Sequence, residues 1–108
     1  MTKQEIFNKV WAGFVAQNWI HSVNEANSMC AYRGVNGTKC AAGILIPDEH
    51  FSPLCECRTI DEINALSPDY APFKSFIRDL QRVHDRSDEG DLKNAMITFA
   101  LENGLTCP

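Results

Sequence analysis

The N-terminal stretch constrains the fold more than any other part of the chain. Thr2 and Glu5 form a Thr-x-x-Glu capping box, which starts a helix by satisfying the free N–H groups of its first turn. Apolar side chains then recur at three- and four-residue spacing: Ile6, Phe7, Val10, Trp11, Phe14 and Val15. This spacing predicts an amphipathic helix over residues 3–17 with one broad apolar face.

Two short helical segments are predicted in the middle of the chain. Thr38 is placed to cap an apolar helix from residue 39 to about residue 45, and Pro47 stops it because the residue before a proline avoids the α region. A second capping box, from Thr59 to Glu62, leads into an apolar stripe that ends at Pro68. The members of that stripe are Ile60, Ile63 and Leu66.

The C-terminal part of the sequence predicts two longer helices. Apolar and aromatic residues at helical spacing mark a helix over residues 72–84, with Pro72 in the first turn, where proline is tolerated. After a charged turn over residues 85–90, a last helix begins near Leu92. Asn103-Gly104 is a good C-terminal stop for it.

The remaining segments read as loops. Residues 18–36 are polar and small, with a short extended piece over 29–33 and a turn at Asn36-Gly37. Trp19 in this segment either closes the core as part of a strand or stands out as an interface patch, and both interpretations stay open. Residues 48–58 are predicted to form an ordered loop, anchored on the core by Phe51 and Leu54.

These patterns predict a mainly α fold. We expect residues 1–108 to form one compact domain of four to five short helices, with at most a minor extended segment or hairpin near residues 29–36. A chain of 108 residues, 44% of them hydrophobic and 22% charged, can build one core without obligatory disulfides or metal.

Charge and hydropathy exclude several classes of partner. The net charge of −4 and the pI near 5.2 argue against a generic binder of nucleic acid or of anionic membranes, which needs clustered Lys and Arg. The N-terminus lacks the pattern of a signal peptide, and no apolar run approaches the roughly 18 residues of a membrane span. We therefore expect a cytoplasmic protein with no membrane partner.

The sequence contains five cysteines, an odd number that favours reduced thiols in a chain without an export signal. Structural zinc sites usually pair their ligands as Cys-x2-4-Cys, a spacing that this chain lacks. A zinc site would have to use Cys30, Cys40, Cys55 and Cys57, with His50 as a substitute ligand. The spacing favours the alternative, in which Cys30 and Cys40 are small buried side chains and the protein has no cofactor.

The segment from residue 30 to residue 48 carries unusual chemistry. It reads Cys-x-Tyr-Arg, a glycine-containing turn and Lys-Cys-Ala-x-Gly-x-Leu-Ile-Pro-Asp, and Leu-Gln-x-x-His-Asp follows at residues 80–85. This order resembles a family of small uncharacterised proteins from bacteriophages and bacteria. The resemblance extends from the first predicted helix to Leu105, and the chain departs from it at Cys55-Glu56-Cys57. It implies an accessory protein that binds a component of a bacterial host, and it implies no biochemical activity.

The same segment offers a candidate ligand site. Arg33 and the backbone N–H groups freed by nearby glycines are suited to grip a phosphate or a carboxylate, helped by the start of the helix at Lys39. The alternative is structural: Tyr32 packs over the core while Arg33 bonds loop carbonyls or pairs with Asp48. The candidate binding residues are Tyr32, Arg33, Lys39 and Asp48.

Two enzymatic interpretations are weaker. His84-Asp85 is reminiscent of metal-dependent phosphohydrolases, but a chain with three histidines lacks the rest of their metal shell, so we expect this pair to end a helix. Cys40 lies near a predicted helix start that would lower its pKa, with His50 or His84 as the base. Sequence spacing does not establish that these side chains meet.

Two classes of function follow. The first is a phage-type accessory protein that binds, and modulates or inhibits, a host protein or a small anionic ligand without catalysis, as in counter-defence. Its contacts would be the loop around Tyr32 and Arg33 together with exposed aromatic side chains, since Trp, Tyr and Arg often anchor interfaces. The aromatics are Trp11, Trp19, Tyr32 and Phe51. The second class is a small metal-binding or cysteine-dependent enzyme built on the cysteine region. The sequence leaves the target and the oligomeric state open.

Overall fold

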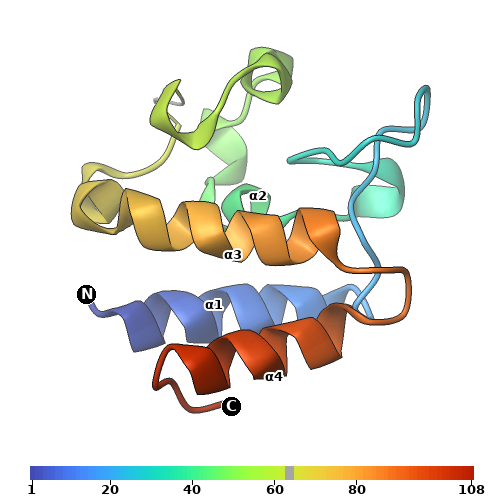
Figure 1. Cartoon of the computed structure of the whole chain (residues 1–108). Helices are drawn as coiled ribbons and strands as arrows, with labels where there is room; N and C mark the ends of the chain where they lie inside the picture. Colours follow the sequence, from blue (N-terminus) through green and yellow to red (C-terminus); the bar gives the residue numbers. More distant parts are fainter. Residues whose placement is uncertain (63–64) are drawn as a thin grey trace.

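Three longer helices run side by side and set the shape of the molecule (Figure 1). The computed structural model describes residues 1–62 and 65–108, and these contain four α-helices. Their bounds are Lys3–Ala16 for α1, Ala41–Leu45 for α2, Lys74–Arg86 for α3 and Leu92–Glu102 for α4. Short 3-10 turns span Val35–Gly37, Asp48–His50, Pro53–Cys57, Ile60–Glu62 and Pro68–Phe73. The predicted mainly α fold class is confirmed.

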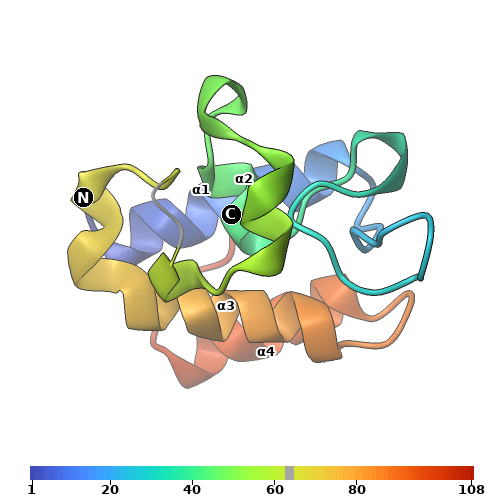
Figure 2. The same cartoon turned by 90° about the horizontal axis from the view of Figure 1, so that it is seen from above.

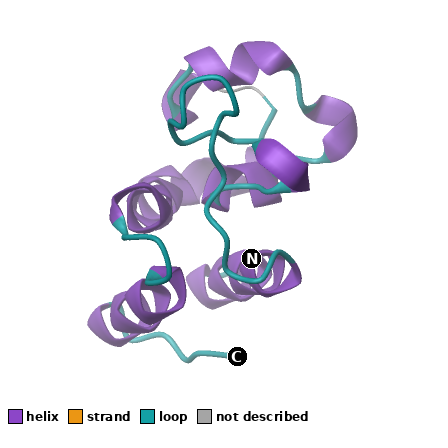
Figure 3. Cartoon of the chain, turned by 90° about the vertical axis from the view of Figure 1, so that its right-hand side faces the viewer, coloured by secondary structure: helices purple, strands orange, loops and turns teal. Residues whose placement is uncertain are grey.

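The helices form a small bundle with a cap of turns on one side. α1 and α3 run in the same direction, α4 returns in the opposite one, and α2 packs against both α1 and α3 (Figure 2). The 3-10 turns between α2 and α3 lie on the side of α3 away from α4 (Figure 3). The radius of gyration is 12.9 Å, the value of a compact domain of this length.

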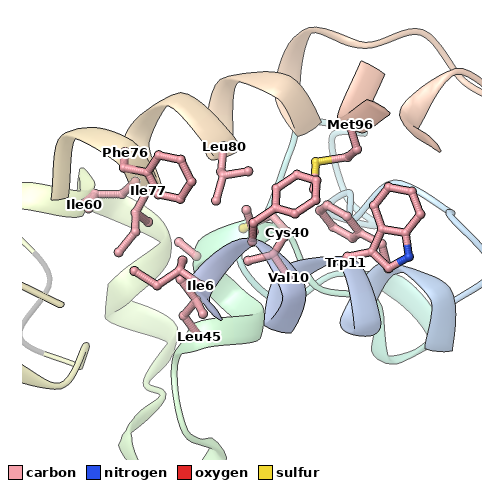
Figure 4. Close-up of a cluster of buried hydrophobic side chains, with 14 of the residues drawn as sticks. Ile6, Val10, Trp11, Cys40, Leu45, Ile60, Phe76, Ile77, Leu80 and Met96 are labelled. Carbon is pink, nitrogen blue, oxygen red and sulfur yellow. The ribbon is translucent and has the colours of Figure 1, made fainter. Parts of the chain in front are cut away.

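One continuous hydrophobic core joins the helices (Figure 4). Phe7 and Phe14 of α1, Leu80 of α3 and Met96 of α4 are almost fully buried, each contributing about 1.5–3 kcal/mol by its removal from water. The rings of Phe7 and Phe99 stack with their centroids 6.3 Å apart, which links the two ends of the chain. No helix in the described residues is long and apolar enough to cross a membrane.

α1 begins at the N-cap that its sequence predicts. The Thr2 hydroxyl accepts a hydrogen bond from the N–H of Glu5. At its other end the helix closes in a Schellman motif. In that motif Asn18 takes the left-handed conformation, and the N–H of Trp19 donates to the carbonyl of Phe14 at 2.8 Å. Trp19 is not part of a strand, and its half-buried ring packs edge-on against Trp11 at 4.7 Å.

α2 starts two residues later than predicted and with a different cap. The side chain of Cys40, rather than Thr38, accepts from the N–H of Gly43, while the Thr38 hydroxyl donates to the carbonyl of Val35. Gly43 is required by close packing, because a Cβ there would collide with the carbonyl oxygen of Tyr32. The helix is central, with all but one of its side chains buried.

The segment before α3 differs from the prediction in its details. Pro72 lies in a 3-10 turn rather than at the start of the helix, so α3 begins at Lys74. The second capping box closes only a 3-10 turn, in which Glu62 accepts hydrogen bonds from the N–H and hydroxyl of Thr59. Leu54 is 69% exposed and does not anchor the loop, whereas Phe51 packs against the core. The predicted stripe residue Ile63 lies outside the described residues.

Extended structure is limited to isolated bridges in the part of the chain that the structure describes. Val23 pairs with Cys30 and Arg33 pairs with Lys39, both antiparallel. The prediction of no more than a minor hairpin near residues 29–36 is confirmed, although the first bridge begins earlier, at Val23. These bridges bring residues 18–30 beside the turn that joins α3 to α4.

Candidate functional site

The guanidinium of Arg33 is held by its own neighbours. Its Nη1 donates to Asp48 Oδ1 at 2.7 Å, and its Nη2 donates to the carbonyl of Ile46 at 2.7 Å. The guanidinium carbon lies 4.7 Å from the ring centroid of Phe51, a cation–π contact. Lys39 Nζ lies 3.4 Å from the same oxygen of Asp48. Arg33 therefore bonds a loop carbonyl and pairs with Asp48, as in the structural alternative.

The backbone donors of this loop also have an internal acceptor. The N–H of Tyr32 donates to Glu56 Oε1 at 2.8 Å, and the N–H of Arg33 donates to Glu56 Oε2 at 3.0 Å. Both oxygens of one carboxylate are used, so Glu56 occupies the place that an external anion would take. The sequence predicted the donors at Tyr32 and Arg33 but not this acceptor, which comes from a 3-10 turn more than twenty residues later.

Two features of the loop bear on ligand binding. The Nε of Arg33 is buried and has no hydrogen-bond partner within the described residues. The side chain of Asp48 is 78% exposed, and its hydrogen bond from Arg33, followed by that from Lys39, lowers the pKa of its carboxyl. An external anion would have to displace this ionised carboxylate. Ligand binding by Tyr32, Arg33, Lys39 and Asp48 stays a prediction.

The structure does not gather the proposed zinc ligands that it describes. No three of Cys30, Cys40, Cys55 and His50 bring their ligand atoms within metal-binding reach of one another. The side chain of Cys57, the fourth predicted thiol, lies outside the described part. Zinc binding by this cysteine region therefore stays a prediction.

The thiols Cys30 and Cys40 lie in different environments. Cys40 is fully buried, as predicted, and this burial raises the pKa of its thiol to about 12. Cys30 is exposed, which corrects the expectation that it is a buried side chain. Partial desolvation and the nearby Asp85 carboxylate still raise the pKa of Cys30 to about 11. Neither thiol has the lowered pKa that a cysteine nucleophile needs.

His84 is buried at the centre of a hydrogen-bonded clamp. The N–H of Ser22 donates to its Nε2 at 2.9 Å, so in the neutral ring the proton resides on Nδ1, which donates to Asp85 Oδ1 at 2.9 Å. The ring stacks on Phe14 with centroids 5.9 Å apart. His84 and Asp85 lie in the last turn of α3, as predicted. The side chain of His84 also ties the 18–30 segment to that helix.

Cys30, His84 and Asp85 are the one group of three ligand-type side chains close enough to hold a metal ion among the described residues. A metal bound at Nδ1 of His84 would replace the proton that is hydrogen-bonded to Asp85. Nε2 would still accept from the N–H of Ser22 and could not carry a proton. The ring would then carry no proton, which is unfavourable for an ordinary histidine ligand. We interpret this group as a structural clamp.

A cavity of about 710 Å³ lies beside this clamp, and we call it the α3–α4 pocket. One wall is formed by residues 18–30 and the other by the turn between α3 and α4, on the side that Figure 3 faces. A second hollow, of about 520 Å³, shares four lining residues with it. These are Asn18, Ile20, His21 and Val23. The 57% exposed side chain of Ile20 therefore borders both cavities.

His21 and Ser87 join the two walls of this pocket. His21 Nε2 lies 2.8 Å from the Ser87 hydroxyl, and the two imidazole rings of His21 and His84 are 5.1 Å apart. Desolvation, followed by the neighbouring His84, lowers the pKa of His21. The sequence predicted neither His21 nor Ser87 as site residues, because 65 residues separate them and no motif links them.

The predicted interface aromatics are less exposed than expected. Trp11 is buried, which corrects its assignment as an exposed anchor. Trp19, Tyr32 and Phe51 are half-buried and pack against the core. The Tyr32 hydroxyl donates to the carbonyl of Arg58 at 2.7 Å, and burial raises the pKa of this phenol. Of the four, Trp19 lines the α3–α4 pocket.

Comparison with known proteins adds no relative: no family model, no curated protein and no solved structure matches this chain. The resemblance to small phage and bacterial proteins therefore stays a prediction, and function has to be argued from the geometry.

Proposed function

We propose that this protein works by binding another protein, without catalysis, and that Ile20 and the α3–α4 pocket form the contact surface. The observation that carries the proposal is the 57% exposed side chain of Ile20 standing between two cavities. An exposed aliphatic side chain beside hollows is typical of a surface that a partner covers.

The engagement of the reactive groups supports binding rather than chemistry. His84 uses both ring nitrogens internally, and the thiols of Cys30 and Cys40 are kept protonated near neutral pH by their raised pKa values. The resemblance to phage proteins supports a protein of a bacterial host as the partner, in the cytoplasm, with modulation or inhibition as the outcome.

A small anion at Arg33 is the second candidate. It is favoured by the unpartnered Nε of Arg33 and by Lys39, whose ammonium lies on the same exposed carboxylate of Asp48. Binding would require the anion to replace Asp48, and this competition makes it the weaker proposal.

Affinity capture from a bacterial lysate tests the leading proposal. The bait is the purified protein and its Ile20→Ser variant, with Leu101→Ser as a matched control, because Leu101 is 77% exposed near the far end of α4. We expect one stoichiometric partner that is retained by the wild type and by Leu101→Ser and lost from Ile20→Ser. Equal retention by all three baits, or no partner at all, would overturn the proposed surface.

A further inference from the structure

The α3–α4 pocket combines an apolar wall with carboxylates of one sign. Trp19, Ile20 and Val23 supply the apolar side, and Asp85 and Glu89 supply the charges. Among the residues that the structure describes, no Lys or Arg lines it. With His21 neutral, which its lowered pKa favours near pH 7, the described lining residues carry a net charge of two negative units.

The two carboxylates differ in how strongly the rest of the chain holds them. Asp85 is fixed through Oδ1, which accepts from His84 Nδ1 at 2.9 Å and from Gln81 Nε2 at 3.0 Å. The neighbouring thiol of Cys30 also forms a hydrogen bond with the Asp85 side chain. Glu89 makes neither a hydrogen bond nor an ion pair within the described residues, although its charge reaches His21 and raises the pKa of that ring against the larger effect of burial.

The ring of Trp19, which lines the pocket, has a cation from outside the pocket near its face. Lys93 Nζ lies 5.9 Å from the ring centroid of Trp19. Cations are attracted to the faces of indole rings, and carboxylates beside such a ring add directed acceptors for N–H groups. An arginine side chain matches this combination, because its planar guanidinium stacks on aromatics and donates to carboxylates at once.

Building on the proposed function, we infer that the α3–α4 pocket receives an arginine side chain of the partner protein. The guanidinium lies between Asp85 and Glu89, and its aliphatic stem packs on Trp19 and Ile20. Charge complementarity carries this choice of occupant: an acidic or neutral segment would bury Glu89 without a counter-charge, which is costly.

The probe for the test is Nα-acetyl-arginine amide, compared with its citrulline counterpart, which has the same shape and no charge. Amide shifts of the ¹⁵N-labelled full chain report where each compound binds. Glu89→Gln removes one pocket charge, and Asp88→Asn is the matched control, because Asp88 is the exposed neighbour that does not line the pocket.

We expect the arginine probe, and not citrulline, to shift amides of residues 18–23 and 87–90. Glu89→Gln should weaken its binding about fivefold, as for loss of one partly exposed charge pair, and Asp88→Asn by less than about twofold. Equal binding of citrulline, equal effects of the two variants, or no shift at the pocket would overturn the inference.

The ring of His21 supplies an independent readout. It faces His84, Asp85, Glu89 and the Ser87 hydroxyl. A bound cation disfavours its protonation further, so saturation with the arginine probe should lower the midpoint of the His21 NMR titration, and an unchanged midpoint would contradict the inference. A partner captured through Ile20 but insensitive to Glu89→Gln would refute the arginine assignment while leaving the proposed function intact.

Discussion

Two polar regions of the molecule differ in how their charges are balanced. Around Arg33, the N–H groups of Tyr32 and Arg33 and both terminal nitrogens of the guanidinium have partners from the same chain, with Glu56 and Asp48 acting as internal anions. In the α3–α4 pocket, Asp85 and Glu89 line an open cavity, and no Lys or Arg of the described residues is part of its walls. A cluster of donors in a sequence therefore indicates a binding site only if the chain does not supply the acceptor itself.

The largest expected effect comes from the packing that closes the Arg33 loop. Gly43→Ala places a methyl group against the carbonyl oxygen of Tyr32, and the required backbone shift should cost about 3 kcal/mol of unfolding free energy or more. Urea denaturation measures it. Gly37→Ala is the control, because its Cβ meets nothing and its positive φ of 74° alone should cost about 1 kcal/mol. Similar losses in both variants would mean that close packing at Gly43 is unimportant.

Removing the carboxylate of Glu56 tests whether the Arg33 loop is closed by an acceptor of its own chain. Glu56→Ala leaves the N–H groups of Tyr32 and Arg33 without their acceptor, and we expect it to lower the unfolding free energy by about 2 kcal/mol. Phosphate added to this variant should restore part of the loss by occupying the vacated place. Glu49→Ala, at an exposed acidic residue, is the control. If phosphate stabilises the wild type as strongly as Glu56→Ala, the loop is not closed by Glu56.

The alkylation rate of the Cys30 thiol reports on the environment of the α3–α4 pocket. A pKa raised from 9.0 to about 11 lowers the thiolate fraction at neutral pH. The greater nucleophilicity of a more basic thiolate offsets part of this, so alkylation by iodoacetamide at pH 7.5 should be about tenfold slower than in the unfolded chain. Peptide mass spectrometry of native and urea-unfolded protein gives both rates, and a native rate above the unfolded one would revive the nucleophile hypothesis.

A smaller effect is expected from the pH dependence of stability. The pKa of His21 is lower in the folded protein than its ordinary 6.5, so the unfolded chain binds more protons as the pH falls below about 7. Stability from this group is present above pH 6.5 and is lost as the pH drops toward the folded pKa. Urea unfolding of the wild type and His21→Asn between pH 8 and 5 measures the difference. A wild type that gains stability on acidification relative to His21→Asn would contradict it.

The fold could be predicted largely from local patterns. The N-cap at Thr2, the apolar stripe of α1 and the Asn103-Gly104 stop of α4 each act within a few residues, and all three are confirmed. The errors come from competition between residues. Cys40 caps α2 in place of Thr38, and Pro72 lies within the 3-10 turn that precedes α3.

The candidate site could be predicted only in part. Pairing of Arg33 with Asp48 was foreseen as an alternative because both residues lie within one short segment. The hydrogen bonds from Ser22 to His84 and between His21 and Ser87 link residues more than sixty positions apart. No local pattern encodes such contacts, which depend on how the 18–30 segment packs against the end of α3.

An amide NMR titration of the wild-type protein with inorganic phosphate and, separately, with Nα-acetyl-arginine amide tests the contrast between the two regions most directly. The predicted result is no saturable shift of the Tyr32 and Arg33 amides with phosphate, because Glu56 holds both N–H groups, and saturable shifts along residues 18–23 with the arginine probe. Saturable phosphate shifts at Tyr32 and Arg33, with no response at the pocket to arginine, would contradict the account.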